Sequence, residues 1–225
     1  MIILTNFKAY PTGVFDNAET LVQVHIDAQK EVHQIKDDVI FAVAINSLDI
    51  QNICNKFADS IDIYAQHCDN AGFGSSTGKI LPEMLVKMGV KGVVLNHSEN
   101  RFSSEYDYKE LISTINFAKN AGLKVVCCAE NPEEGEFLSK NSDADFIAVE
   151  PPELIGGDIS VSTAQPELIS DSVDKIGKNK VLIGAGIKTG SDVKIAIEKG
   201  AVGVLLASGV TKSRVPKEVL LDLAL

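Results

Sequence analysis

The amino-acid sequence predicts an α/β protein in which residues 1–225 form a single (β/α)8 barrel domain with eight parallel strands. Three observations lead to this prediction. Eight short apolar runs rich in β-branched residues recur along the chain, longer segments with helical spacing separate them, and no linker or low-complexity tract interrupts the alternation. Apolar runs without polar alternation are typical of parallel strands covered on both faces. Strands that alternate with helices indicate an α/β fold.

None of the apolar runs is long enough for a buried helix, so we expect each to be a strand. They cover residues 2–4, 39–44, 61–65, 92–95, 123–127, 146–149, 181–183 and 203–206. Between them, apolar residues recur with helical spacing, for example over 18–26, 111–118 and 191–199. Gly89, Gly122 and Gly200 follow three helical segments, at positions where glycine is favoured as a left-handed cap.

An open doubly wound sheet is the alternative fold. Such a sheet usually has fewer strands, and it often carries a G-x-G-x-x-G turn after its first strand, which this chain lacks. Eight repeated units therefore favour the closed barrel. In both folds, functional groups gather at the carboxyl ends of the strands, so the residues that directly follow each run are the candidate site residues.

The charge balance argues against some classes of partner. The chain has 21 basic and 31 acidic residues, which gives a formal net charge of −10. Such a chain is not expected to present a broad basic face to nucleic acid or to an anionic membrane. An anionic substrate would have to be held by local features of the site.

The cellular setting is predicted from the cysteines and the apolar segments. Cys54, Cys68, Cys127 and Cys128 form no C-x-x-C pair, and we expect them to be reduced and packed. The first residues lack the basic and apolar regions of a signal peptide. The longest apolar run, near residues 201–207, is far shorter than a membrane span. These features predict a cytoplasmic protein.

Three ionisable residues directly follow predicted strands: Lys8 after the first, His97 after the fourth and Glu150 after the sixth. Desolvation at the end of an apolar strand would raise the pKa of Glu150 and strengthen it as a base. A histidine in such a place can polarise a carbonyl group or relay protons. Glu99 and Arg101 share the short turn with His97, and three ionisable groups so close together need mutual compensation or a purpose.

Each of these residues also has an ordinary explanation. Taken alone, Lys8 is more often a surface lysine at the start of a loop, and His97 is more often a hydrogen-bonded structural residue. Glu150 alone is compatible with a salt-bridged residue in a proline-rich turn.

The other histidines are expected to have no chemical role. His25 and His33 lie in the polar part of the first helical segment, and we expect both to be solvated. His67 follows the third strand without a comparable polar setting. No His-x-His pair or histidine-rich cluster falls at the strand ends, so no metal or other cofactor is expected.

The segment after the sixth strand has the composition of a moving lid. Pro151 and Pro152 stiffen its entry, and Gly156 and Gly157 allow a large change of backbone direction at its exit. The alternative is an ordinary proline-rich turn that ends in glycine.

Small residues dominate the segments after the last two strands. These segments are Gly184-Ala185-Gly186 and Ala207-Ser208-Gly209, and they allow backbone N–H groups to approach a ligand closely. In many barrels the loops after strands seven and eight form a phosphate site. The alternative is that these small residues only form turns. Because they occur after both strands where a phosphate site is expected, they favour a phosphate site.

The ordered set of motifs resembles the triose-phosphate isomerase family. Asn6-x-Lys8, His97-Ser98-Glu99-x-Arg101 and Glu150-Pro151 follow the first, fourth and sixth strands, and the agreement extends over essentially the whole chain. The short chain and the Leu205-Leu206-Ala207-Ser208-Gly209 ending resemble the archaeal branch. The resemblance implies a cofactor-free isomerase of glycolysis and gluconeogenesis. Its reaction would interconvert D-glyceraldehyde 3-phosphate and dihydroxyacetone phosphate through an enediol or enediolate.

The resemblance also implies a role for each matching residue. Glu150 would take the proton from the carbon next to the carbonyl, and His97 would move protons between the two enediol oxygens. Lys8 would offset the developing charge, Asn6 would help to hold the substrate, and Glu99 would brace Lys8. Contacts from protein to phosphate would come from Ile155, Gly156, Gly186, Ala207 and Ser208.

The resemblance further implies a homo-oligomer, either a dimer or a tetramer. Residues 66–78 resemble the dimer-forming loop of the family. Lys79 stands where many members carry an acidic residue, which leaves the subunit contacts open.

Two other function classes remain possible from the sequence. A different phosphate-binding barrel enzyme, such as a sugar-phosphate epimerase or an indole-glycerol-phosphate-type enzyme, would keep the last two loops. It has no need of the set Asn6, Lys8, His97 and Glu150. A non-catalytic barrel that binds phosphorylated metabolites would not need an intact acid, base and electrophile.

Overall fold

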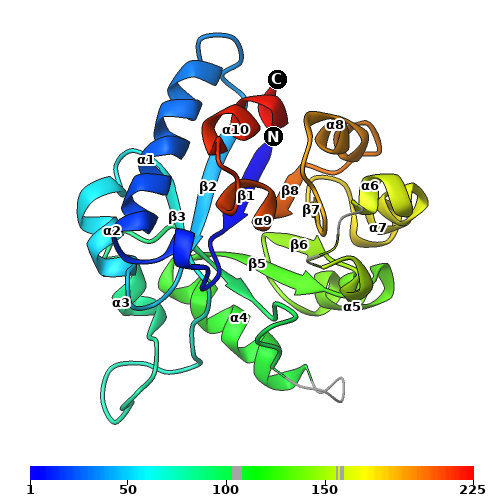
Figure 1. Cartoon of the computed structure of the whole chain (residues 1–225). Helices are drawn as coiled ribbons and strands as arrows, with labels where there is room; N and C mark the ends of the chain where they lie inside the picture. Colours follow the sequence, from blue (N-terminus) through cyan, green and yellow to red (C-terminus); the bar gives the residue numbers. More distant parts are fainter. Residues whose placement is uncertain (103–107, 156, 158–159) are drawn as a thin grey trace.

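The chain forms a closed barrel of eight parallel strands enclosed by helices, as seen in a computed structural model (Figure 1). The structure describes residues 1–102, 108–155, 157 and 160–225. Each strand pairs with the next one in the sequence, and β1 pairs with β8 through the register Leu4↔Leu205, which closes the barrel. The predicted fold class is confirmed, and the alternative of an open sheet is excluded.

All eight predicted strands are present. They are β1 (Ile2–Asn6), β2 (Ile40–Ile45), β3 (Asp62–Ala65), β4 (Gly92–Leu95), β5 (Lys124–Ala129), β6 (Phe146–Val149), β7 (Val181–Ile183) and β8 (Gly203–Leu206). Two of them, β1 and β5, extend two residues beyond the predicted carboxyl end.

Helices connect the strands on the outside of the barrel. They are α1 (Phe15–Val32), α2 (Ile50–Phe57), α3 (Pro82–Lys87), α4 (Lys109–Ala121), α5 (Pro132–Asn141), α6 (Val161–Ala164), α7 (Pro166–Ile176), α8 (Gly190–Glu198), α9 (Ser208–Thr211) and α10 (Pro216–Ala224). Two short 3-10 helices, η1 (Pro11–Gly13) and η2 (Pro152–Leu154), follow β1 and β6. Gly89, Gly122 and Gly200 have φ values of 92°, 105° and 98°, which confirms the predicted left-handed positions at three helix ends.

Most strand residues are apolar because both faces of the sheet are buried. One set of side chains fills the interior of the barrel: Leu4, Ala42, Ala44, Tyr64, Val94, Val126, Cys128, Ala148, Leu182 and Leu205. The other set, which includes Ile3, Val43 and Ile63, packs with the inner faces of the helices. This double burial explains why the strand sequences lack the alternation of a half-exposed sheet.

His25 on α1 is buried, so the prediction that it is solvated is wrong. Its Nδ1 lies 2.7 Å from the carbonyl oxygen of Leu21, and its Nε2 lies 2.9 Å from Oγ1 of Thr5. Nδ1 therefore donates to the carbonyl and Nε2 accepts from the hydroxyl. Burial lowers the pKa of His25 to about 4, which keeps the ring neutral. The polar partner comes from β1, and helix periodicity contains no sign of it.

His33, in contrast, is exposed as expected, although its Nε2 lies 2.7 Å from the carbonyl oxygen of Val39. All four cysteines are free and buried, as the sequence predicts.

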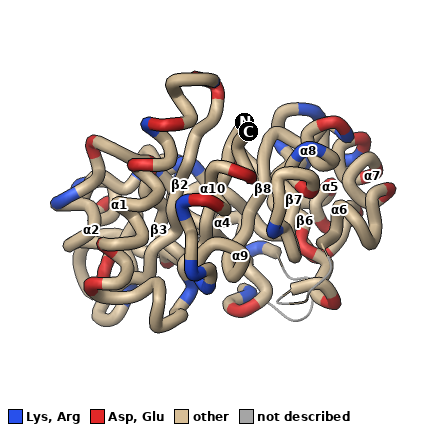
Figure 2. The backbone as a smooth tube through the Cα atoms, turned by 45° about the horizontal axis from the view of Figure 1, so that its top comes forward, with Lys and Arg blue, Asp and Glu red and all other residues tan. Residues whose placement is uncertain are grey.

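Acidic and basic residues are interspersed over the described parts of the surface (Figure 2). Within those parts, no helix combines the length and the apolarity that crossing a bilayer requires. The same residues contain no group of three or more His, Cys, Asp or Glu side chains that could hold a metal ion.

Candidate active site

The carboxyl ends of the strands bring most of the predicted site residues into one cleft. Its lining includes Asn6, Lys8, His97, Glu150, Ile155, Gly186, Ala207 and Ser208. Glu99 borders an adjoining cavity that shares Asn6, Lys8 and His97 with the cleft. Gly156 lies outside the described residues. Segments that are far apart in sequence meet here because parallel strands all end on the same side of the barrel.

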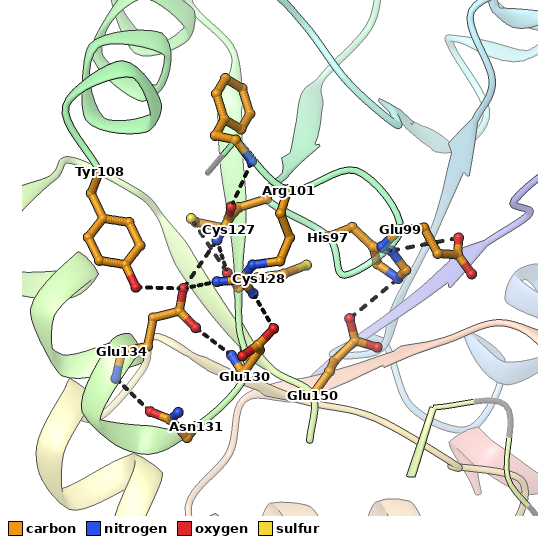
Figure 3. Close-up of polar contacts among 12 residues, drawn as sticks. His97, Glu99, Arg101, Tyr108, Cys127, Cys128, Glu130, Asn131, Glu134 and Glu150 are labelled. Carbon is orange, nitrogen blue, oxygen red and sulfur yellow. Dashed lines mark hydrogen bonds and ion pairs between the residues drawn. The ribbon is translucent and has the colours of Figure 1, made fainter. Parts of the chain in front are cut away.

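Glu150 and His97 face each other across the cleft (Figure 3). Oε2 of Glu150 lies 3.6 Å from Nε2 of His97, and the two side chains are only 9% and 8% exposed. This oxygen is buried and has no hydrogen-bond partner among the described residues. A buried carboxylate oxygen left without a donor is costly, and such an atom suggests a functional role.

The surroundings of Glu150 favour its protonated form more than water does. Burial raises the pKa of Glu150 to about 7, although the charge of Lys8 and a hydrogen bond with the Cys128 thiol oppose the rise. The negative charge of Glu99 adds to it. A carboxylate with this pKa is a much stronger base than an ordinary glutamate, yet about half of it is ionised at neutral pH.

His97 is held as a neutral ring with a defined tautomer. The backbone N–H of Glu99 donates to Nδ1 at 3.1 Å, so Nδ1 acts as an acceptor. The ring proton therefore resides on Nε2, the nitrogen that faces Glu150. Burial and the positive charge of Lys8 together lower the pKa of His97 to about 4, against the opposing effect of the Glu99 charge. At neutral pH, His97 presents a hydrogen-bond donor and no charge.

Lys8 supplies the cation of the cleft. Its Nζ lies 2.6 Å from Oε1 of Glu99, and its backbone has a positive φ of 51°. The side chain of Asn6 accepts from the backbone N–H of Lys8 at 3.0 Å, which stabilises this unusual turn. Strained backbone of this kind is concentrated at functional sites.

Gln66 is a supporting residue that the sequence interpretation missed. Its Nε2 lies 3.1 Å from each of three oxygens: the side-chain oxygen of Asn6 and the carbonyl oxygens of Lys8 and Ala44. The available signal was its position directly after β3, the same kind of position that identified His97 and Glu150.

A buried polar network holds the turn that carries His97 (Figure 3). Asn96 has a positive φ of 58°, and its amide donates to the carbonyl oxygen of Cys128 at 3.0 Å. The carboxylate of Glu134, on the first turn of α5, accepts from Asn96, Arg101 and the Tyr108 hydroxyl. Arg101 of the sequence motif therefore does not reach the cleft lining, and it joins the turn after β4 to α5.

Gly184 leaves room for the Glu150 carboxylate. A Cβ atom at this position would lie 2.7 Å from Oε1 of Glu150 and 2.8 Å from the carbonyl oxygen of Leu205. A side chain at residue 184 would therefore displace either the carboxylate or the neighbouring backbone.

The side of the cleft formed after β7 and β8 is lined by uncharged residues, several of them small. Gly186 has a φ of 75°, and Ala207 precedes the short helix α9, whose first residue is Ser208. The first amides of a helix have no partner inside it and are available to an anion. The cleft thus combines a strong base, a neutral donor and a cation with an uncharged wall of small residues.

Comparisons of the sequence with known proteins point to one family. The family model described as "Triosephosphate isomerase" matches residues 1–220. Two proteins named triosephosphate isomerase, from Methanobrevibacter smithii and Archaeoglobus fulgidus, are each 39% identical over 99% of this chain and 96% of their own. A third with that name, from Methanocaldococcus jannaschii, is 38% identical over 99% of this chain and 98% of its own. The chain therefore belongs to the triosephosphate isomerase family.

Proposed function

We propose that this protein interconverts D-glyceraldehyde 3-phosphate and dihydroxyacetone phosphate without a metal or other cofactor, as a step of glycolysis and gluconeogenesis. The observation that carries the proposal is the unpartnered Oε2 of Glu150, which lies opposite the protonated Nε2 of His97. A base and a hydrogen-bond donor that face each other suit the transfer of a proton between two neighbouring carbons, one of which carries the carbonyl oxygen. The family membership supports the choice of substrate.

In this mechanism the Glu150 carboxylate takes the proton from carbon 2 of glyceraldehyde 3-phosphate. The C–H electrons form the double bond of the enediolate, and the carbonyl oxygen gains negative charge. His97 donates from Nε2 to that oxygen and then takes up the proton of the neighbouring hydroxyl. Glu150 returns its proton to carbon 1, which completes dihydroxyacetone phosphate.

A neutral imidazole is suited to this role because its proton affinity lies close to that of the enediolate, a feature already established for this family. A donor aimed at a developing oxyanion contributes about 3 kcal/mol in such sites. Lys8 offsets the charge, Asn6 helps to hold the substrate, and Glu99 braces Lys8, consistent with the ion pair of 2.6 Å.

We further propose that the phosphate group binds the backbone of Ile155, Gly156, Gly186, Ala207 and Ser208. The described members of this set line the cleft, which supports the assignment. We also propose that residues 151–157 act as a lid, because an enediol phosphate that is exposed to solvent would eliminate its phosphate group.

We propose that the protein is a homo-oligomer, at least a dimer, formed through residues 66–78. A cavity of about 500 Å³ opens beside Lys8 and His97, with Met84 and Met88 among its apolar lining. Phe73, in the middle of residues 66–78, is 60% exposed, and we propose that its side chain fills this cavity on a second copy. Lys79 pairs with Asp69 of its own loop at 2.9 Å, so its charge is compensated without a partner chain.

Analytical ultracentrifugation tests this assembly. The wild type should sediment as a dimer or tetramer, and Phe73→Ser should shift it toward monomer. A wild-type monomer would contradict the proposal.

The free, buried cysteines are consistent with a reducing compartment, and we propose that the protein is cytoplasmic.

A coupled assay tests the reaction itself. Glyceraldehyde 3-phosphate is supplied with a metal chelator, and dihydroxyacetone phosphate is read out as NADH oxidation by glycerol-3-phosphate dehydrogenase. Turnover should persist in the chelator and disappear in Glu150→Gln. A folded wild type that binds phosphate without turnover would instead indicate a non-catalytic barrel, and turnover of another sugar phosphate would indicate an epimerase-type enzyme.

A further inference from the structure

Asp192, in the first turn of α8, lies beneath the loop that follows β7. It is 7% exposed, although it carries a charge. Its Oδ2 accepts from the backbone N–H groups of Lys188 and Thr189 at 3.1 and 3.0 Å, and from the Thr189 hydroxyl at 2.9 Å. Its Oδ1 accepts a short hydrogen bond from the hydroxyl of Ser160. One carboxylate thus connects two loops that are separate in sequence.

Further bonds strengthen this connection. The hydroxyl of Ser162 donates to the backbone carbonyl of Asp192 at 2.9 Å. The backbone N–H of Val161 donates to the carbonyl of Ala185 at 3.1 Å. Residues 160–162, at the start of α6, and residues 185–189 are therefore fixed to each other around Asp192.

The loop that Asp192 holds is a wall of the cleft. Gly186 and Ile187 line the cleft directly before the two amides that donate to Asp192. Gly209 of α9 lies against residues 187–188 from the side away from Asp192. A Cβ at Gly209 would lie 2.9 Å from the Ile187 carbonyl oxygen and 3.4 Å from Cα of Lys188. Residues 187–188 are thus packed tightly between α9 and Asp192, so a displacement of Asp192 would also displace the backbone that lines the cleft.

The carboxylate is stable in its ionised form. Burial alone would raise the pKa of Asp192, but the hydrogen bonds from Ser160, Lys188 and Thr189 outweigh burial and lower it. Hydrogen bonds to a charged acceptor are stronger than those between neutral groups. The contacts of Asp192 therefore fix the loop more firmly than an amide at the same position would.

We propose that Asp192 is a positioning residue for the substrate phosphate: it sets the backbone of residues 185–189 against the β8 loop in the arrangement that binds the anion. This inference rests on the phosphate site assigned under the proposed function. It also joins that site to residues 160–162, which follow the proposed lid in the sequence.

Asp192 also takes part in the capping box of α8 with Thr189, and this role alone would explain its presence. The two roles predict different consequences. A cap that only stabilises the helix changes the unfolding temperature and leaves ligand affinity unchanged. If Asp192 positions the phosphate site, its substitution weakens the binding of ligands that carry a phosphate group and leaves the binding of other ligands unchanged.

The test compares Asp192→Asn with the wild type. Titration calorimetry measures the affinity for inorganic phosphate. Steady-state kinetics give kcat and KM with glyceraldehyde 3-phosphate, and kcat/KM with glyceraldehyde, which has no phosphate group. We expect phosphate affinity to fall about tenfold, with a matching rise in KM, because an amide cannot accept from all four donors at once. We expect kcat, and kcat/KM for glyceraldehyde, to change less than about threefold, because Glu150 and His97 are not displaced.

Asp222→Asn is the matched control. Asp222 on α10 accepts from the backbone N–H of Gly190 at 2.7 Å, at the first turn of the same helix α8. Asp222 is not among the described residues that line the cleft. This variant should keep wild-type phosphate affinity even if α8 is equally destabilised.

The inference is overturned if Asp192→Asn folds and binds phosphate as tightly as the wild type, or if Asp222→Asn weakens binding to the same extent. Should Asp192→Asn fail to fold, Ser160→Ala removes the hydroxyl that donates to Asp192 and caps α6, and it leaves the bonds made by Val161 and Ser162 between the loops. A loss of about threefold in phosphate affinity is then expected. Unchanged affinity in Ser160→Ala would then overturn the inference. Phosphate binding that depends on Asp192 in a wild type without isomerase activity would contradict the proposed function and leave the inference standing.

Discussion

The two walls of the cleft are built by different means. The wall formed after β1, β4 and β6 carries Lys8, His97 and Glu150. Burial raises the pKa of Glu150 and lowers that of His97, and the positive charge of Lys8 lowers both. The wall formed after β7 and β8 consists of uncharged residues, several of them small, with Gly186 at a positive φ. The difference separates two tasks: the charged wall suits proton transfer, and the backbone wall suits binding of an anion. Substitutions in the first should change kcat, and substitutions in the second should change affinity.

The largest effect that would sharpen this contrast is expected from Glu150→Asp. Removing one methylene group withdraws the carboxylate from the substrate, and a displacement of about 1 Å can cost about 10²-fold in rate. We expect kcat to fall about 10²- to 10³-fold while the affinity for inorganic phosphate stays within about twofold. Steady-state kinetics and calorimetry measure the two quantities.

Glu218→Asp provides the control for this variant, because it removes the same group from an exposed residue of α10 that does not line the cleft. It should keep wild-type kcat. If Glu150→Asp turned over at a near-normal rate, Glu150 would not be the base.

Gly184→Ala tests the contrast between the two walls at the residue where they meet, because Gly184 follows β7 but lies against Glu150. The new Cβ would lie within 3 Å of Oε1 of Glu150 and of the Leu205 carbonyl, as the distances of 2.7 and 2.8 Å show. We expect displacement of the carboxylate and a fall in kcat of about 10- to 100-fold, larger than any change in phosphate affinity. A variant with unchanged kcat would show that Glu150 tolerates the crowding.

Gly186→Val tests the backbone wall directly. A β-branched residue is strained at a φ of 75°, and its side chain would crowd the cleft. The affinity for inorganic phosphate should fall about tenfold, with a smaller fall in kcat. Unchanged affinity in the folded variant would place the phosphate elsewhere.

The smallest effect is expected from a change of pH without any substitution. Because Glu150 must be ionised to act as the base, its pKa of about 7 should appear as a fall in kcat/KM toward acid. Between pH 7 and pH 6 the ionised fraction drops about fivefold, and kcat/KM should follow. His97, with a pKa of about 4, should add no further step in this range. An inflection near 4.5 instead would mean that burial does not tune Glu150.

The sequence was sufficient to predict the barrel and the residues at its strand ends, for a physical reason. Parallel strands all end on one side, so residues directly after β1, β4 and β6 must lie near one another once the strands are identified. The positions of Lys8, His97 and Glu150 in one cleft follow from this rule.

The supporting residues could not be predicted in the same way. Glu134 and Asp192 lie in the first turns of helices, where an acidic residue is common for its effect on the helix alone. Only the folded chain reveals that Glu134 meets Arg101 and that Asp192 meets Ser160. His25 was assigned wrongly for the same reason, since its partner Thr5 is contributed by a strand.

The central claim is that a single base moves a proton between neighbouring carbons, and isomerisation in deuterated water tests it most directly. Glyceraldehyde 3-phosphate is converted in D2O, and the dihydroxyacetone phosphate is examined by proton NMR. Exchange of the proton held on Glu150 with solvent should place deuterium on carbon 1 of the product, and Glu150→Gln should abolish both turnover and labelling. Product that forms in the folded Glu150→Gln variant at the wild-type rate, with or without deuterium, would mean that another group moves the proton and would contradict the account.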